Sequence, residues 1–195
     1  MAGKQAKVLT EAQQKAVLSY LETTRHSARD KVAFLLSVKA GLRAIEIAGL
    51  QWRHLTDVEG NLADAITITD EVAKGNKGGR VVVMNKHLKC ALTDLQALKM
   101  RDLSDPVFYS ERKRGNVASQ TIIDWFSSLY EKLGFDGASS HSGRRTFITN
   151  AAKKITTVGG SLRDVQNLAG HASLQTTQRY IESDEEAKRK IVDLV

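Results

Sequence analysis

Six side chains, spread along the chain from residue 43 to residue 180, form a set suited to attack on a phosphodiester. A tyrosine hydroxyl that attacks phosphorus needs cations around the non-bridging oxygens and a proton donor for the leaving oxygen. The chain offers a tyrosine, two arginines, two histidines and a turn lysine: Tyr180, Arg43, Arg144, His141, His171 and Lys74. The set predicts strand-transfer chemistry on DNA.

Arg43 and Glu46 are three residues apart in a short helix expected over residues 43–50. At this spacing the two side chains can form an ion pair. A solvated surface pair is the ordinary interpretation. The alternative is that Glu46 holds the guanidinium rigid, so that Arg43 makes two parallel hydrogen bonds to phosphate.

Lys74 begins a glycine-rich turn, Lys74–Gly79, whose glycines let the backbone come close to a ligand. A flexible ammonium at this tip could reach a leaving oxygen and protonate it. Lys77 is the nearby competitor for that role, and an exposed lysine that adds only solubility is the other alternative.

His141, Arg144 and Arg145 stand at the start of a helix expected over residues 142–155. Helix N-termini favour anions, so cations at this place indicate an anionic partner. His141 and Arg144 share one face of the helix. Arg145 points about 100° away around the helix axis and is interpreted as a structural or backbone-contacting residue.

His171 follows Gly170 at a helix break, and Tyr180 lies nine residues further on. Of the four tyrosines, Tyr20 and Tyr130 belong to apolar helix patterns and Tyr109 follows Phe108 in an expected strand, whereas Tyr180 has polar and cationic neighbours. A nucleophile that faces DNA requires such surroundings. The ordinary alternative is a buried aromatic ring with a bonded hydroxyl.

The pattern of apolar residues predicts a mainly α fold with a small antiparallel β-sheet, an α+β domain. Thr10 is expected to cap the first helix, and a helix over residues 27–39 is apolar nearly all round, which is typical of a central core helix ended by Gly41. Period-two patterns over residues 65–69 and 80–84 predict a hairpin. Further helices are expected over residues 86–101, 117–133, 161–169, 174–180 and 184–195.

Composition narrows the classes of protein to which this chain can belong. The 195 residues suit one domain, and the net charge of +7 favours a polyanionic partner, although a merely soluble basic protein would also fit. The single cysteine, Cys90, excludes an intrachain disulfide and a cysteine-rich zinc site; we expect it to be buried. Five scattered histidines make a poor metal site, and the chain shows no P-loop, secretion signal or membrane span.

Five segments resemble motifs of the tyrosine recombinase (phage integrase) family. The resemblance extends over about residues 10–182, and the spacings from histidine to arginine and from histidine to tyrosine agree with the family pattern. The matching segments are Gly41–Glu46, Lys74–Lys77, His141–Phe147, Leu168–His171 and Thr176–Tyr180.

The resemblance implies a role for each of the six residues. Tyr180 would attack the scissile phosphate to give a 3′-phosphotyrosyl link, Lys74 would protonate the 5′-oxygen, and His141 would assist proton removal from Tyr180. Arg43 and Arg144 would clamp the non-bridging oxygens, with His171 adding a third hydrogen bond. Because the covalent link keeps the phosphodiester energy, the resemblance implies that neither ATP, a metal ion nor another cofactor is needed.

Double-stranded DNA is the expected partner, bound by a dimer to tetramer of identical chains in the nucleoid of a bacterial cytoplasm. We expect residues 1–9 to be flexible, residues 10–182 to form the catalytic domain, and residues 183–195 to form a helix that docks on a neighbouring protomer. No N-terminal core-binding domain is expected. The residues expected to contact DNA are Lys77, Arg80, Arg112, Lys113, Arg114, Arg145 and Arg179.

Two departures from the family pattern lie close to the motifs. Gly143 stands where the family usually has leucine, and we expect it to loosen the packing under Arg144 and slow the reaction. Met84 stands where a proline is common at the end of the second strand. Neither departure falls on one of the six residues.

Two other functions remain open from the sequence. A type IB topoisomerase-like enzyme would use the same chemistry to nick and reseal DNA without exchanging strands. A non-catalytic DNA-binding regulator or excision factor could use the helices near residues 162–169 and 174–180 as a helix-turn-helix.

Overall fold

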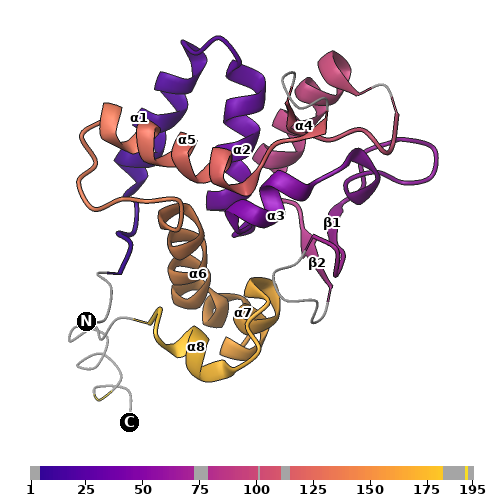
Figure 1. Ribbon diagram of the computed structural model, residues 1–195. Helices are drawn as coiled ribbons and strands as arrows, with labels where there is room; N and C mark the ends of the chain where they lie inside the picture. The colour runs from indigo at the N-terminus through magenta and orange to yellow at the C-terminus, as the bar shows by residue number, and fades with distance from the viewer. Residues whose placement is uncertain (1–4, 73–78, 101, 111–114, 182–191, 193–195) are drawn as a thin grey trace. The chain divides into compact units, whose positions relative to one another are not determined.

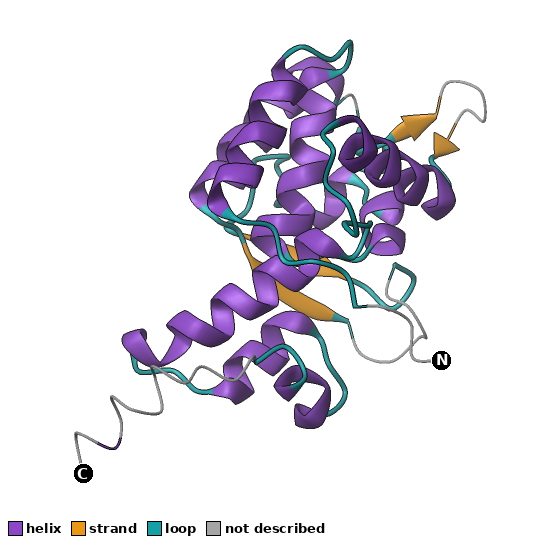
Figure 2. Ribbon diagram, turned by 90° about the vertical axis from the view of Figure 1, so that its left-hand side faces the viewer, coloured by secondary structure: helices purple, strands orange, loops and turns teal. Residues whose placement is uncertain are grey.

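The structure, a computed structural model, describes residues 5–72, 79–100, 102–110, 115–181 and 192. Helices predominate, and the strands form two small antiparallel hairpins, as the sequence predicted for the fold class (Figures 1 and 2). The chain divides into two compact units, residues 1–147 and 148–195. The division falls within α6 (Ser142–Lys154).

The first unit is built around α2, which packs against α1 and α4, while α3 packs against α5. Residues 32–38 of α2 are all buried, which confirms the prediction of a central core helix. A reciprocal pair of hydrogen bonds between Thr10 and Gln13 caps α1, also as predicted. The helices of this unit are α1 (Glu11–Glu22), α2 (Ser27–Ala40), α3 (Ala44–Gly49), the short 3-10 helix η1 (Trp52–His54), α4 (Lys86–Lys99) and α5 (Ser119–Lys132).

Gly41 ends α2 in the left-handed conformation, with a φ of 65°. A Cβ at this position would lie 2.4 Å from Cδ1 of Phe147, so the ring occupies the space that any larger residue would need. Glycine adopts this backbone conformation without the steric penalty that other residues incur. The turn delivers Arg43 to the start of α3, where it is the N-terminal capping residue.

The predicted hairpin forms between β1 (Ala65–Ile68) and β2 (Arg80–Val83), with Ala65 opposite Val83 and Ile68 opposite Arg80. The backbone N–H of Met84 donates to the Asp64 carbonyl at 2.8 Å. A proline at position 84 would lack this donor. A second hairpin pairs β3 (Tyr109–Ser110) with β4 (Gly115–Asn116).

The segment before α1 is bonded through its backbone to the rest of the first unit at Lys7 and Leu9. The Lys7 N–H donates to the Gly137 carbonyl at 3.3 Å, and the Leu9 N–H donates to Thr146 Oγ1 at 2.8 Å. Leu9 is itself buried. Lys7 and Leu9, expected at the end of a flexible segment, therefore have hydrogen-bond partners in the fold.

The prediction that Cys90 is buried is wrong, because the side chain is exposed. The buried stripe of α4 consists of Leu88, Ala91, Leu92 and Leu95, which recur at helical spacing. Cys90 is two residues beyond Leu88, about 200° around the helix axis, and so lies on the opposite side.

The second unit contains the end of α6, the short 3-10 helix η2 (Ile155–Val158), α7 (Leu162–Ala169) and α8 (Leu174–Gln178), with α7 packed against α8. Gly170 ends α7 with a φ of 61°. The helix predicted to run to Tyr180 ends at Gln178, and Tyr180 lies in the following turn. The helix predicted over residues 184–195 lies outside the described residues, apart from residue 192. Within the described ranges, no helix combines the length and apolar character needed to cross a bilayer.

Gly143 does not loosen the packing under Arg144, so that part of the expectation is wrong, while its effect on the reaction stays a prediction. A Cβ at position 143 would lie 2.3 Å from Ser37 Oγ and 2.9 Å from Ser37 Cβ. The first turn of α6 therefore approaches α2 as closely as a glycine allows. A leucine would not fit without moving one of the two helices.

We predict that Gly143→Ala lowers the free energy of unfolding by about 1–3 kcal/mol, because the added methyl group overpacks the contact with Ser37. Urea denaturation measures the change. Ser37→Gly alone should cost about 1 kcal/mol as a helix-interior glycine. If the contact is the cause, the double variant loses less stability than the sum of the two single variants, whereas strict additivity would contradict it.

Candidate active site

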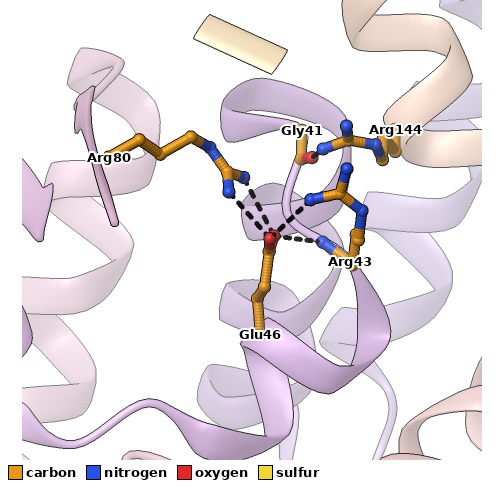
Figure 3. A network of polar contacts seen from close by, with 5 residues as sticks. All are labelled: Gly41, Arg43, Glu46, Arg80 and Arg144. Carbon is orange, nitrogen blue, oxygen red and sulfur yellow. Dashed lines mark hydrogen bonds and ion pairs between the residues drawn. The ribbon is translucent and has the colours of Figure 1, made fainter. Parts of the chain in front are cut away.

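A buried carboxylate joins two arginines in the first unit. Glu46 is fully buried, and Figure 3 shows its carboxylate between Arg43 and Arg80. It accepts hydrogen bonds from the Arg43 backbone N–H and Nη1, both at 2.8 Å, and from Arg80 Nη1 and Nη2 at 2.7 and 2.9 Å. The ion pair expected between Arg43 and Glu46 is present, and it is a buried contact rather than a solvated surface pair.

The electrostatics of Glu46 follow from these contacts. Burial alone would raise the pKa of the carboxyl, because it disfavours the charged form. The hydrogen bonds and charge of Arg80, together with those of Arg43, outweigh burial and lower the pKa to about 2. Glu46 is therefore ionised at neutral pH and holds both guanidinium groups in place.

Arg144 is anchored close by through the backbone. It extends from the first turn of α6, is 4% exposed, and donates from Nη1 to the carbonyl of Gly41 (Figure 3). Gly41 and Arg43 are two residues apart, so this bond lies within roughly 8 Å of the Arg43 backbone. The structure thus brings together both arginines that were predicted to bind phosphate.

The cluster of Arg43, Arg80, Arg144 and Glu46 combines three guanidinium groups with one carboxylate and so carries a net charge of +2. The Arg43 side chain is 26% exposed and that of Arg80 is 10% exposed. Arg43 can therefore be reached from outside while Glu46 holds it from within. Fixed guanidinium groups of this kind suit a phosphate oxyanion, because little reorganisation is needed when it binds.

His141 and Arg145 flank Arg144 in the sequence. His141 is exposed, its backbone N–H donates to Ser139 Oγ at 3.3 Å, and its carbonyl accepts the Arg145 N–H at 2.9 Å. The guanidinium of Arg145 donates to the Gln5 side-chain oxygen, an intrachain contact consistent with a structural residue. Whether Arg145 also contacts DNA stays a prediction.

In the second unit, His171 and Tyr180 lie against one another. Their rings are stacked with centroids 5.4 Å apart and planes 26° apart. The backbone N–H of His171 donates to the Gln166 carbonyl at 3.1 Å, and the Gln166 side-chain amide donates to the His171 carbonyl at 2.9 Å. The Tyr180 carbonyl accepts from Thr149 Oγ1 at 3.3 Å. Both residues are partly buried, whereas the neighbouring Arg179 is exposed.

Several predicted site residues lie outside the described residues. They are the turn lysines and the basic loop: Lys74, Lys77, Arg112, Lys113 and Arg114.

The contact between Arg80 and Glu46 was missed by the sequence analysis, which placed Arg80 among residues that contact DNA. A signal was present, because Arg80 and Val82 lie on the same face of β2 and Val82 is buried. An arginine at such a position requires a buried anion. A direct contact between Arg80 and DNA stays a prediction.

Comparisons with known proteins agree on one family. Residues 7–187 match the pattern of the Phage integrase family. The tyrosine recombinase XerC of Brucella suis is 34% identical over 170 residues, which cover 86% of this chain and 50% of XerC. The chain therefore spans about half the length of this curated relative.

Two solved structures have a similar fold. The crystal structure of the XerA recombinase superposes with a TM-score of 0.72 at 25% identity, covering 98% of this chain and 65% of XerA. The XerH site-specific recombinase bound to its palindromic difH substrate gives a TM-score of 0.72 at 20% identity, covering 98% and 53% of the two chains.

We predict that Glu46 makes a pH-dependent contribution to stability. Its folded pKa is lowered from 4.5 to about 2, so its contribution of about 3 kcal/mol is fully present above pH 4.5 and is lost as the pH falls towards 2. The gap in unfolding free energy between the wild type and Glu46→Gln should be constant near neutrality and narrow over this acid range. Urea denaturation at stepped pH measures it.

Glu131→Gln is the matched control, since Glu131 is an exposed carboxyl on α5. The difference in unfolding free energy between Glu131→Gln and the wild type should stay small at every pH. A Glu46→Gln gap that does not change between pH 5 and pH 2 would contradict the ionised, doubly paired state of Glu46.

Proposed function

Because the chain belongs to the phage integrase family, we propose that it is a site-specific recombinase that cuts and rejoins double-stranded DNA. The observation that carries the proposal is the Glu46 carboxylate, which holds Arg43 in place near the anchored Arg144. Two fixed guanidinium groups are what a phosphodiester needs as negative charge builds on its non-bridging oxygens.

In the proposed reaction Tyr180 is the nucleophile. Its phenolic oxygen forms a bond to the scissile phosphorus as the bond from phosphorus to the 5′-oxygen breaks, which gives a 3′-phosphotyrosyl link and a free 5′-hydroxyl. His141 assists removal of the phenolic proton, and Lys74 donates a proton to the departing 5′-oxygen. Attack by the 5′-hydroxyl of another strand then reverses each step.

Arg43, Arg144 and His171 act on the same phosphate in this proposal. The two arginines bind the non-bridging oxygens, and the imidazole donates a third hydrogen bond. Removing one such donor typically costs about 10²–10³ in rate. Since the phosphotyrosyl bond keeps the energy of the phosphodiester, the reaction is proposed to need neither ATP nor a metal ion.

Double-stranded DNA is the proposed substrate. The net charge of +7 supports it, because each cation that neutralises a phosphate releases counterions. XerH, whose fold this chain shares, was solved bound to its palindromic difH substrate. We propose that the protein acts at the nucleoid, in the cytoplasm of a bacterial cell. The proposed DNA contacts are Lys77, Arg80, Arg112, Lys113, Arg114, Arg145 and Arg179.

We predict that Tyr180→Phe abolishes covalent trapping on DNA while leaving binding unchanged, because only the phenolic oxygen is removed. The substrate is a nicked suicide duplex carrying a site selected by this protein from a random library. Denaturing gel electrophoresis detects the adduct, and a mobility shift measures binding. Wild-type protein that binds the selected site but never forms the adduct would favour a non-catalytic regulator.

The topoisomerase alternative is separated by a supercoiled plasmid that lacks the selected site. A recombinase should leave this plasmid supercoiled, whereas a type IB topoisomerase-like enzyme should relax it efficiently. Efficient relaxation of the site-free plasmid would contradict the recombinase proposal.

Residues 183–195 are proposed to dock on a neighbouring protomer when the protein assembles on DNA. We predict that deleting the residues after Ser183 lowers the fraction of dimers and tetramers on a duplex carrying two sites, while one protomer still binds one site. Mass photometry of the complexes measures both. An unchanged distribution of oligomers would count against this role.

A further inference from the structure

Thr177 lies between His171 and Tyr180 and contacts both. It is in α8 and is fully buried, although the residues on either side of it are exposed. Its Oγ1 is 3.0 Å from Nδ1 of His171, and its backbone carbonyl accepts the Tyr180 N–H at 3.0 Å. One residue therefore holds the imidazole with its side chain and the tyrosine with its backbone.

The direction of the hydrogen bond between Thr177 and His171 follows from the hydroxyl. A neutral imidazole carries its proton on one nitrogen and accepts on the other, and the hydrogen bond at the first nitrogen decides which tautomer is present. A buried hydroxyl must place its own proton on an acceptor. Within the described part of the chain, the acceptor that Thr177 Oγ1 reaches is Nδ1 of His171.

The hydroxyl therefore donates, and the imidazole proton lies on Nε2. If His171 instead donated from Nδ1, the Thr177 hydroxyl proton would be left buried without an acceptor among the described residues. Such a group costs about 1–3 kcal/mol. The arrangement with Thr177 as donor avoids this cost.

We propose that Thr177 is a positioning residue that fixes His171 as the Nε2–H tautomer, so that Nε2 donates to the scissile phosphate. This inference rests on the proposed function, in which His171 supplies the third hydrogen bond to that phosphate. Without the hydroxyl, the ring can rotate or carry its proton on Nδ1, and Nε2 then presents a lone pair to a phosphate oxygen and repels it.

The contact also limits where Tyr180 can lie. The imidazole that Thr177 fixes is stacked on the Tyr180 ring, and the Tyr180 N–H is bonded to the Thr177 carbonyl. The stacking limits the orientation of the Tyr180 ring, and the backbone bond fixes the main chain from which that ring extends. Thr177 thereby acts on the nucleophile through two routes.

The test begins with the free protein and needs no DNA. Two-bond ¹H–¹⁵N correlation spectra report which imidazole nitrogen carries the proton, and loss of one signal in His171→Gln assigns it. At a pH where the ring is neutral, we expect the Nε2–H tautomer in the wild type and a mixture in Thr177→Val, which keeps the shape but removes the hydroxyl. A wild type with its proton on Nδ1 would overturn the inference without any variant.

Two variants serve as controls. Thr177→Ser keeps the hydroxyl and should keep the tautomer. Thr176→Val is the same change one residue earlier, where the side chain is exposed and its hydroxyl lies 3.5 Å from Ser173 Oγ. It should leave the His171 signal unchanged. A tautomer unaltered by Thr177→Val would overturn the inference.

Adduct formation on the suicide duplex supplies the second measurement. Thr177→Val should slow it by about 10- to 100-fold, by analogy with the cost of removing the hydrogen-bond partner of a metal-bound histidine, while Thr177→Ser stays near the wild-type rate. In a His171→Ala background, Thr177→Val should have no further effect, because the group it orients is absent. An equal loss in that background would show that Thr177 matters only for packing.

Failure of the inference and failure of the proposed function give different results. A wild type that binds its site but forms no adduct defeats the recombinase proposal, whatever the tautomer. If the wild type forms the adduct but the His171 proton lies on Nδ1, only the role of Thr177 is defeated. The same holds if Thr177→Val forms the adduct as fast as the wild type.

Discussion

The geometry of the arginine cluster depends on one buried charge, the carboxylate of Glu46. A fully buried carboxylate is tolerated only when donors surround it, and Glu46 has four, all from Arg43 and Arg80. This requirement ties the start of α3 to the start of β2, 34 residues away. It also fixes the guanidinium of Arg43 from within while leaving that side chain partly exposed. Rigidity and access are both needed if Arg43 is to bind a phosphate as charge develops on it.

Two glycines complete the positioning through the backbone. The left-handed turn at Gly41 ends α2 and presents the carbonyl that accepts from Arg144. Gly143, one residue before Arg144, lets α6 approach α2 so closely that an added Cβ would collide with the side chain of Ser37. The second arginine is therefore placed by helix packing and by a main-chain carbonyl, and the first by a side-chain ion pair. The two arginines have different supports, so a change that disturbs one need not release the other.

Local patterns predicted most of the fold. Thr10, Gly41 and Gly170 mark helix ends through capping and left-handed turns, which depend on neighbouring residues alone. The pair of Arg43 and Glu46 is also local. The pairing of Arg80 with Glu46, the exposure of Cys90 and the close packing at Gly143 were not predicted, because each depends on which helix face or strand face meets which neighbour. Thr177 was not predicted for a related reason. The sequence alone does not distinguish it from the adjacent Thr176, because only the structure shows that Thr177 is buried and bonded to the His171 imidazole.

Arg43, held by Glu46, is proposed to neutralise negative charge on the scissile phosphate. The most direct measurement replaces that one phosphate in the suicide duplex with a neutral methylphosphonate and compares adduct formation by the wild type and Arg43→Ala. On the natural phosphate Arg43→Ala should lose about 10²–10³ in rate, and on the methylphosphonate most of that loss should disappear, because the charge that Arg43 offsets is gone. An equal loss on both substrates would contradict the claim.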